Sequence, residues 1–334
     1  MTVYYLYYAV NISVAGSYYN SGSKCTYFVA QTVTRIMKNF PNTNTYKNLP
    51  IYWSLDYLKV GDVETRTKSG PLAEIVLNGE VPGVEIIAPL AATREELLVV
   101  HDEKYIDGLL GGDVDLARSI LASTGGVRDA LDAMFVHGRS GSFSSGLHHA
   151  GYDYANGLCY INGLALAALR AIKLFGAIKV GILDTDSHCG GGTFELVSEN
   201  EKVVLADVSC NSFDMWKPNA TRHHLEIVGD ASEYLDAVKR GLTHIEGVDA
   251  LIYNAGMDPF EGCNMGGMQG ITRELLAERE RLVAQWCEDT QTPAMFVLAG
   301  GYGGPNLDLD GVARLHLPTI QEFARIQISN KINR

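Results

Sequence analysis

Short apolar runs alternate with stretches of helical periodicity from residue 84 onward, and this alternation restricts the possible folds more than any other feature of the sequence. Continuous apolar runs are typical of strands buried on both faces, and strands that alternate with helices form parallel sheets. The predicted strands cover residues 84–88, 142–147, 178–183, 203–208, 250–254 and 294–299. The predicted helices cover residues 25–40, 94–99, 103–110, 127–135, 158–175, 231–243, 273–289 and 311–325. The sequence therefore predicts an α/β fold with an open, mainly parallel sheet and helices on both faces.

The size and composition of the chain fit one folded domain over residues 1–334. Of the 334 residues, 46% are hydrophobic and 20% are charged, which excludes a mainly disordered chain. The net charge is −12, whereas sequence-independent nucleic-acid binding requires a basic face, so we expect no nucleic-acid partner. The sequence is compatible with a homo-oligomer. Residues 1–80 are polar and rich in tyrosine, and their pattern assigns no secondary structure apart from the helix at 25–40.

The cysteines and the apolar runs indicate a cellular compartment. Six cysteines stand at irregular spacing without a C-x-x-C pair, which is typical of reduced thiols in the cytoplasm. No apolar run approaches the roughly 18 residues of a membrane helix, so we expect no membrane association. The first residues lack the basic segment of a signal peptide. We therefore predict a cytoplasmic protein.

Acidic and imidazole side chains follow two of the predicted strands, at the edge of the sheet where ligands bind in such folds. Asp184, Asp186 and His188 come after one strand, and Asp258 comes after another. Alternate residues of an extended segment point to the same side, so the first three side chains can converge. Carboxylates and an imidazole suit Zn²⁺ or Fe²⁺, and three protein ligands leave a position open for water. A solvated acidic loop is the alternative, but buried carboxylates are costly without a partner.

Other positions offer acid–base chemistry beside that cluster. His148 and His149 form a tandem pair in which one imidazole can take a proton from water and return it to a leaving amine. The alternative is a hydrogen-bonded pair of core histidines. Tyr302 lies in a Gly-Gly-Tyr-Gly turn, where its phenol can stabilise an oxyanion or serve only for packing. A second tandem pair, His223 and His224, follows no predicted strand, and we expect it at the surface.

Together these segments resemble the zinc-dependent histone deacetylase family, which includes acetoin-utilisation proteins, acetylpolyamine amidohydrolases and histone-deacetylase-like amidohydrolases of bacteria. The similarity runs over residues 97–314, with matching segments in the same order at 100–105, 124–126, 147–150, 156–162, 184–193, 258 and 301–302. The resemblance implies the open α/β fold that this family shares with arginase. It also implies that Asp186, His188 and Asp258 are the zinc ligands.

The resemblance assigns catalytic roles by position. His149 corresponds to the principal acid/base, and His148 assists it electrostatically. Asp184 corresponds to the carboxylate that holds His148. Tyr302 corresponds to the phenol that polarises the substrate carbonyl.

Two further sites follow from the same resemblance. Gly157 corresponds to the residue whose carbonyl meets the substrate amide in a narrow tunnel, and Leu158 is the tunnel residue beside it. Asp184, Ser209 and Cys210 correspond to the site of a structural monovalent cation, K⁺ or Na⁺.

The sequence also departs from the family pattern. Cys189 and Gly191 stand where the family has a second histidine and then an aspartate or asparagine. Glycine cannot orient His149, so we expect its usual carboxylate partner to be missing and another group or water to take that place. Without a nearby anion, the pKa of His149 should be lower than in relatives that carry the acid. Leu158 replaces the usual phenylalanine, which predicts a wider slot. Residues 1–80 lack the recognisable N-terminal pattern of the family.

The predicted activity is zinc-dependent hydrolysis of an acylated amine, such as acetyl-lysine, an acetylpolyamine or an N-acylated metabolite. One alternative is a binuclear manganese ureohydrolase of the arginase type, which requires more bridging ligands. The other is a catalytically silent ligand-binding or scaffold protein on the same fold, which the departures at Gly191 and Leu158 motivate.

Overall fold

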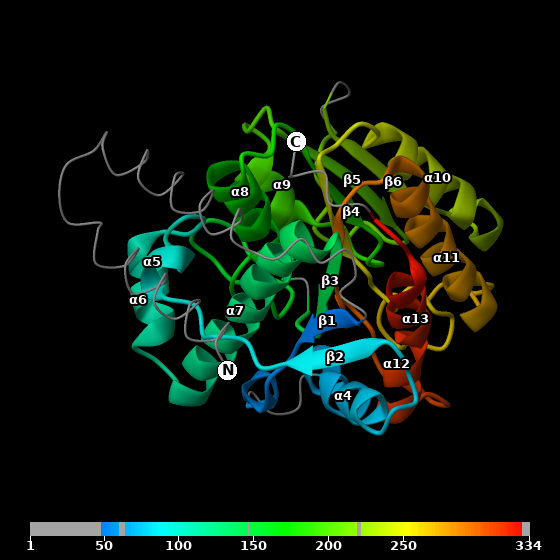
Figure 1. Ribbon diagram of the computed structural model, residues 1–334, viewed down its shortest axis with the longest axis horizontal. Helices are drawn as coiled ribbons and strands as arrows, with labels where there is room; N and C mark the ends of the chain where they lie inside the picture. Colours follow the sequence, from blue (N-terminus) through cyan, green and yellow to red (C-terminus); the bar gives the residue numbers. More distant parts are fainter. Residues whose placement is uncertain (1–47, 60–63, 146, 219–221, 329–334) are drawn as a thin grey trace. The chain divides into compact units, whose positions relative to one another are not determined.

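The computed structural model describes residues 48–59, 64–145, 147–218 and 222–328, and within these ranges eight strands form one sheet (Figure 1). The strands are β1 (Leu49–Tyr52), β2 (Val84–Ile87), β3 (Arg139–Ser142), β4 (Val180–Asp184), β5 (Val203–Ser209), β6 (His224–Ile227), β7 (Ala250–Asn254) and β8 (Ala294–Val297). Their order is β2-β1-β3-β8-β7-β4-β5-β6, and each neighbouring pair is parallel. The predicted open parallel sheet is confirmed. The predicted helix at 25–40 lies outside the described residues.

Helices cover both faces of the sheet, as the sequence predicts. They are η1 (Leu55–Leu58), α3 (Glu64–Thr67), α4 (Ser69–Leu77), α5 (Arg94–Leu97), α6 (Glu103–Leu110), α7 (Val114–His137), α8 (Gly163–Phe175), α9 (Gly191–Val197), η2 (Ala231–Glu233), α10 (Tyr234–His244), α11 (Arg273–Thr290), α12 (Leu309–Leu315) and α13 (Leu317–Arg325). Figure 1 shows α7 and α8 on one side of the sheet and α10, α11 and α13 on the other.

Adjacent residues of a central strand belong to two different cores. Ile182 of β4 packs with residues of α7 and α8, whereas Leu183 packs with residues of α10 and α11. Both side chains are fully buried. Burying such a side chain contributes about 1.5–3 kcal/mol, so a polar residue at either position would weaken the packing of a helix layer on the sheet. Because both faces of the sheet are buried, successive residues of such a strand are mostly apolar, which explains the continuous apolar runs in the sequence.

Helix α8 begins five residues later than the periodicity predicts. Asn162 caps it, because its side chain accepts a hydrogen bond from the backbone N–H of Ala165. Leu158, the predicted first residue, has a φ of 62° and cannot belong to a right-handed helix. The helix ends at Phe175, as predicted, and Gly176 follows it with a φ of 70°, which suits a left-handed cap.

Three other predicted elements have wrong boundaries. The helix predicted at 127–135 is α7, which begins at Val114, because the side chain of Asp113 caps it there, and continues to His137. The strand predicted at 142–147 is β3, which ends at Ser142, where its pairing with Val297 of β8 ends. The chain then turns through Leu147, whose φ is 60°. The segment predicted at 311–325 consists of two helices that meet at His316.

The carboxyl ends of β3, β4, β7 and β8 meet at one edge of the sheet. The polar segments singled out in the sequence follow these strands. Within the described ranges, no helix combines the length and the apolar character that crossing a bilayer requires.

Candidate metal centre and active site

The loops after β4 and β7 bring Asp186, His188 and Asp258 together. Each offers one ligand atom, and these atoms all lie within 4.8 Å of one another. Asp186 and Asp258 are almost completely buried, and His188 is partly exposed. The cluster therefore has a closed side formed by carboxylates and an open side next to the imidazole.

Backbone amides hold the two carboxylates in place. Asp186 Oδ2 accepts a hydrogen bond of 2.7 Å from Gly300, and Asp258 Oδ1 accepts one of 2.9 Å from Ser187. Position 300 must be glycine, because a Cβ there would lie 2.4 Å from Asp258 Oδ2 and 2.5 Å from Asp186 Oδ2. The loop after β8 therefore closes directly over the carboxylates.

The remaining oxygen of Asp258 is suited to a cation. Within the described part of the chain, Asp258 Oδ2 is buried without a well-aligned hydrogen bond, and its near neighbour is Nδ1 of His188 at 3.0 Å. Burial and the neighbouring carboxylate of Asp186 raise the pKa of Asp258 to about 6. A buried, unsatisfied carboxylate oxygen beside a second carboxylate and an imidazole is a donor set that fits Zn²⁺.

His148 and His149 lie next to this cluster, and each is paired with a carboxylate. His148 Nδ1 donates to Asp184 Oδ2 at 2.8 Å, as the resemblance implies. His149 Nδ1 donates to Asp214 Oδ2, also at 2.8 Å. The group that takes the place of the usual carboxylate partner is therefore Asp214, and His149 does have an anion beside it. Position 191 is indeed empty of a side chain, but Asp214 reaches His149 from the segment that follows β5.

The two histidines have opposite pKa shifts. Burial opposes protonation of His148, but the carboxylates of Asp184 and Asp186 outweigh it and raise the pKa to about 10. Burial and the nearby His148 lower the pKa of His149, against the hydrogen bond to Asp214. At neutral pH the pair therefore holds one protonated and one neutral imidazole. Environments that separate two pKa values in this way distinguish an acid from a base.

Tyr302, Gly157 and Leu158 approach the same centre. The Tyr302 ring lies edge-on to His188, with 6.4 Å between the ring centroids. Burial and the carboxylates of Asp186 and Asp258 raise the pKa of Tyr302, so its phenol remains a hydrogen-bond donor. Tyr302 therefore keeps its proton throughout the physiological pH range.

The backbone at Gly157 and Leu158 is left-handed. Their φ values are 51° and 62°. A Cβ on Gly157 would lie 2.2 Å from Cδ2 of His149, so only glycine allows this approach. Leu158 is 48% exposed, and its carbonyl accepts a hydrogen bond of 3.1 Å from the guanidinium of the buried Arg66. Leu158 therefore presents an apolar side chain to solvent, next in the chain to the glycine that approaches His149.

The predicted monovalent-cation site remains a prediction. Asp184 and Asp207 are register partners on β4 and β5, and both carboxylates are fully buried. Burial and the nearby Asp184 raise the pKa of Asp207 to about 7. Ser209 donates from Oγ to Asp207 Oδ1 at 2.5 Å, and the backbone N–H of Cys210 donates to Ser187. Adjacent buried carboxylates are where a cation would be stabilised.

Sequence reasoning missed two residues beside the histidines. Asp214 is one of many aspartates in the sequence, and no spacing relates it to His149. Phe213 precedes it and stands edge-on to His149, at 5.1 Å between ring centroids, and to His188, at 5.9 Å. The expectation that His223 lies at the surface is also wrong, since its ring is buried and accepts a hydrogen bond from Leu205.

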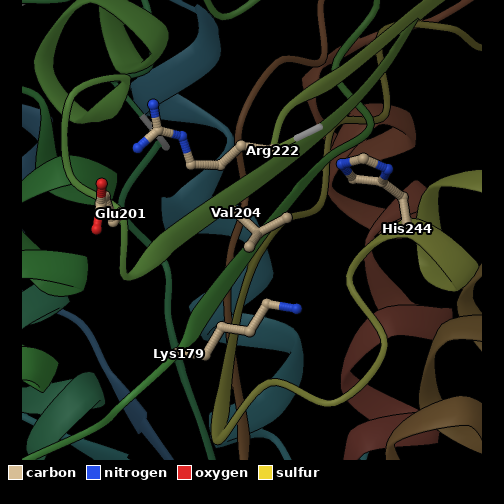
Figure 2. A pocket seen from close by; sticks show the side chains of 5 residues that line it. All are labelled: Lys179, Glu201, Val204, Arg222 and His244. Carbon is tan, nitrogen blue, oxygen red and sulfur yellow. The ribbon is translucent and has the colours of Figure 1, made fainter. Parts of the chain in front are cut away.

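Figure 2 shows a hollow at the other end of the strands. Its volume is about 450 Å³, and it is lined by Lys179, Glu201, Val204, Arg222 and His244. Lys179 directly precedes β4, whereas the metal-ligand candidates follow that strand. None of the residues singled out in the sequence lines this hollow, so the candidate chemistry belongs to the carboxyl ends of the strands.

Comparison with known proteins agrees with this geometry. Residues 64–310 match the model of the histone deacetylase domain. The chain is 22% identical over 279 residues to histone deacetylase 2 of Arabidopsis thaliana, which covers 75% of this chain and 70% of that protein. It is 27% identical over 183 residues to acetylpolyamine amidohydrolase of Mycoplana ramosa, but this covers only 49% of the chain and 51% of the relative.

A solved structure is similar over a longer stretch. The crystal structure of the HDA15 HD domain superposes with a TM-score of 0.68 and covers 82% of this chain and 90% of that one. The sequence identity is 21%, so this likeness shows the arginase/deacetylase fold alone.

Proposed function

This chain belongs to the histone deacetylase domain family, and we propose that it is a zinc-dependent hydrolase that removes an acetyl or other acyl group from an amine. The observation that carries the proposal is the convergence of Asp186, His188 and Asp258 beside a tandem histidine pair in which each imidazole has its own carboxylate. Metal binding and acid–base chemistry are thus placed side by side, as metal-assisted hydrolysis requires.

We assign the metal to the three clustered ligands. Asp186 and Asp258 would hold zinc from the buried side, and His188 from the open side. When bound, zinc acts as a Lewis acid toward water and the substrate carbonyl.

The acid–base residues divide the proton transfers between them. His149 is neutral at neutral pH and donates Nδ1–H to Asp214, so its Nε2 is free to take a proton from the attacking water. The same nitrogen then gives that proton to the leaving amine. His148 remains protonated against Asp184 and contributes a positive charge to the site. Tyr302 donates a hydrogen bond to the developing oxyanion, which stabilises the transition state more than the substrate.

The substrates we propose are acetyl-lysine in a peptide, acetylpolyamines and N-acylated metabolites. The net charge of −12 suits a cationic amine product. Leu158 and Phe213, which are 48% and 47% exposed, offer apolar walls for an aliphatic chain. We further propose a cytoplasmic protein that acts without a nucleic-acid or membrane partner and is compatible with a homo-oligomer.

The two alternatives are less well supported by these contacts. A silent scaffold has no need for Asp214 beside His149. A binuclear manganese site requires further ligands, but within the described ranges the only cluster of three such side chains is Asp186, His188 and Asp258.

The test is release of acetate by zinc-loaded protein from an acetyl-lysine peptide, an acetylpolyamine and a simple N-acetylated amine. We expect turnover with at least one of them and its loss on chelation. Asp258→Asn should lose zinc and turnover together, whereas Asp115→Asn, an exposed carboxylate of α7, should keep both. Hydrolysis of none of the three substrates would favour the scaffold. Binding of two manganese ions per chain would favour the ureohydrolase.

A further inference from the structure

We propose that Asp214 is the positioning residue of His149, and that its carboxylate depends on the space that Gly191 leaves open. The proposal rests on the proposed function, since it concerns the base of that reaction. The motif at residues 184–193 does not reveal this carboxylate, because Asp214 comes from a different segment of the chain.

The contact between Asp214 and His149 is short and sheltered. Asp214 Oδ2 lies 2.8 Å from His149 Nδ1, and the two side chains are 16% and 6% exposed. The edge of Phe213 and the backbone of Gly157 approach the same imidazole. The ring is therefore fixed on several sides. A hydrogen bond at Nδ1 places the proton on that nitrogen and leaves the lone pair on Nε2.

A side chain at position 191 would occupy the space that the Asp214 carboxylate fills. A Cβ on Gly191 would lie 2.5 Å from Oδ1 and 2.5 Å from the backbone oxygen of Asp214. Any side chain at position 191 would therefore push Asp214 away. The absence of a side chain at 191 is the condition that lets the other carboxylate reach His149.

The segment that carries Asp214 is anchored to the loop after β4. The N–H of Cys189 donates to the carbonyl of Phe213 at 3.0 Å, and its thiol donates to Asn211 at 3.3 Å. Trp216 donates from Nε1 to Asp207 at 2.9 Å. Asp214 itself has a φ of 59°, a conformation that aspartate and asparagine tolerate better than most residues. The carboxylate is thus held by a fixed loop on both sides.

Asp214→Asn and Asp214→Gly test the proposal. Asparagine keeps the size and the left-handed backbone but removes the charge, and glycine leaves an open space beside His149 Nδ1. We expect kcat to fall by about 10²–10⁴-fold in both variants, while KM and zinc content stay close to those of the unmodified protein. Added formate should restore part of kcat in Asp214→Gly but not in Asp214→Asn, where no space is open. Asp153→Asn, an exposed carboxylate, is the control.

Gly191→Ala should lower kcat by displacing the Asp214 carboxylate. It should slow turnover in the unmodified background. In Asp214→Asn it should have a much smaller effect, because both changes act through the orientation of His149. Retention of kcat within about threefold in Asp214→Asn, or a loss in Asp214→Gly that formate does not reverse, would overturn the proposal.

An NMR measurement separates this inference from the proposed function. The Nδ1 proton of His149, assigned by its disappearance in His149→Gln, should be shielded from exchange in the unmodified protein and exchange rapidly in Asp214→Gly. If the protein hydrolyses no acylated amine but shows this signal, the function fails and the positioning contact stands. If hydrolysis is observed and the signal is unchanged in Asp214→Gly, the function stands and the inference fails.

Discussion

Lys68 donates a hydrogen bond of 2.5 Å from Nζ to the backbone carbonyl of Ala299, three residues before Tyr302. The lysine is fully buried, and a Cβ on Gly301 would lie 3.1 Å from the same Nζ. Ala299 has a φ of 48°, so the backbone is held there in a conformation that alanine rarely adopts. A residue between α3 and α4, far from Tyr302 in the sequence, thus supports the loop that carries the phenol.

Replacing Lys68 with methionine should therefore weaken both stability and turnover. The variant removes the hydrogen bond that Lys68 donates to the carbonyl of Ala299, and the loss of a buried hydrogen bond costs about 1–3 kcal/mol. We expect this loss in the free energy of unfolding measured with urea, and a lower kcat because Tyr302 is less well placed. Lys104→Met, at an exposed position, is the matched control. Equal unfolding curves for Lys68→Met and the control would show that the hydrogen bond contributes nothing.

Zinc should stabilise the folded protein. Asp186, His188 and Asp258 come together only in the native state, so a ligand at 100 times its Kd adds about 2.7 kcal/mol. Adding zinc to chelator-treated protein should raise Tm in differential scanning calorimetry. His188→Ala should abolish this rise, and His224→Ala, which removes a histidine of β6, should not. A rise that persists in His188→Ala would move the metal to other ligands.

Tyr302→Phe should separate chemistry from binding. The change deletes one donor to the oxyanion, which typically lowers kcat by about 10²–10³-fold. Zinc content and the circular dichroism spectrum should not change, since the phenol is not among the clustered ligands. Tyr152→Phe, with a side chain that is 51% exposed, serves as the control. An unchanged kcat would mean that Tyr302 serves for packing.

Gly157→Ala should displace the imidazole of His149. The new methyl group would lie 2.2 Å from Cδ2 of His149, in a backbone conformation with a φ of 51°. Gly79 also has a positive φ, of 80°, but its Cβ would meet nothing within 4 Å. Gly79→Ala therefore measures the backbone strain alone, about 1–2 kcal/mol. We expect Gly157→Ala to lose at least tenfold in kcat, and Gly79→Ala to lose stability only. Similar kcat values for the two variants would argue against contact with His149.

His137 should make the fold sensitive to acid. Burial, assisted by the charge of Arg139, lowers its pKa from 6.5 to about 4. As the pH falls, His137 is protonated in the unfolded chain before it is protonated in the folded protein. The free energy of unfolding therefore keeps its full value above pH 6.5 and decreases as the pH drops toward 4. The loss reaches at most about 3 kcal/mol. His137→Gln should lose less stability than the unmodified protein between these limits in urea titrations. Parallel losses in the two proteins would assign the acid sensitivity to other groups.

Most of the sheet could be predicted, because buried strands have a local signature. The apolar run at β4 and the helix pattern at α11 each lie within a few residues of the observed element. The start of α8 was missed because apolar residues at 158–161 continue the helical spacing, whereas the cap at Asn162 decides where the helix begins. Strand β3 was misplaced since its end depends on its pairing with β8, which is not a local property.

The candidate site shows the same division. Asp186 and His188 lie two residues apart in the chain, so their convergence follows from the geometry of one segment. The contact between His149 and Asp214 spans 65 residues and depends on how the segment after β5 folds over Gly191. A glycine in a motif indicates that a side chain is missing there, but it does not indicate which other side chain fills the space.

Phe213 and Asp214 are neighbours in one loop, and this has a consequence for how the protein can change. Phe213 forms an apolar wall beside His149, and Asp214 accepts the hydrogen bond that orients the imidazole of His149. Mutation or recombination that reshapes the wall in order to admit a new molecule also moves the carboxylate. The shape of this wall and the orientation of His149 therefore cannot be changed independently, because one short loop determines both.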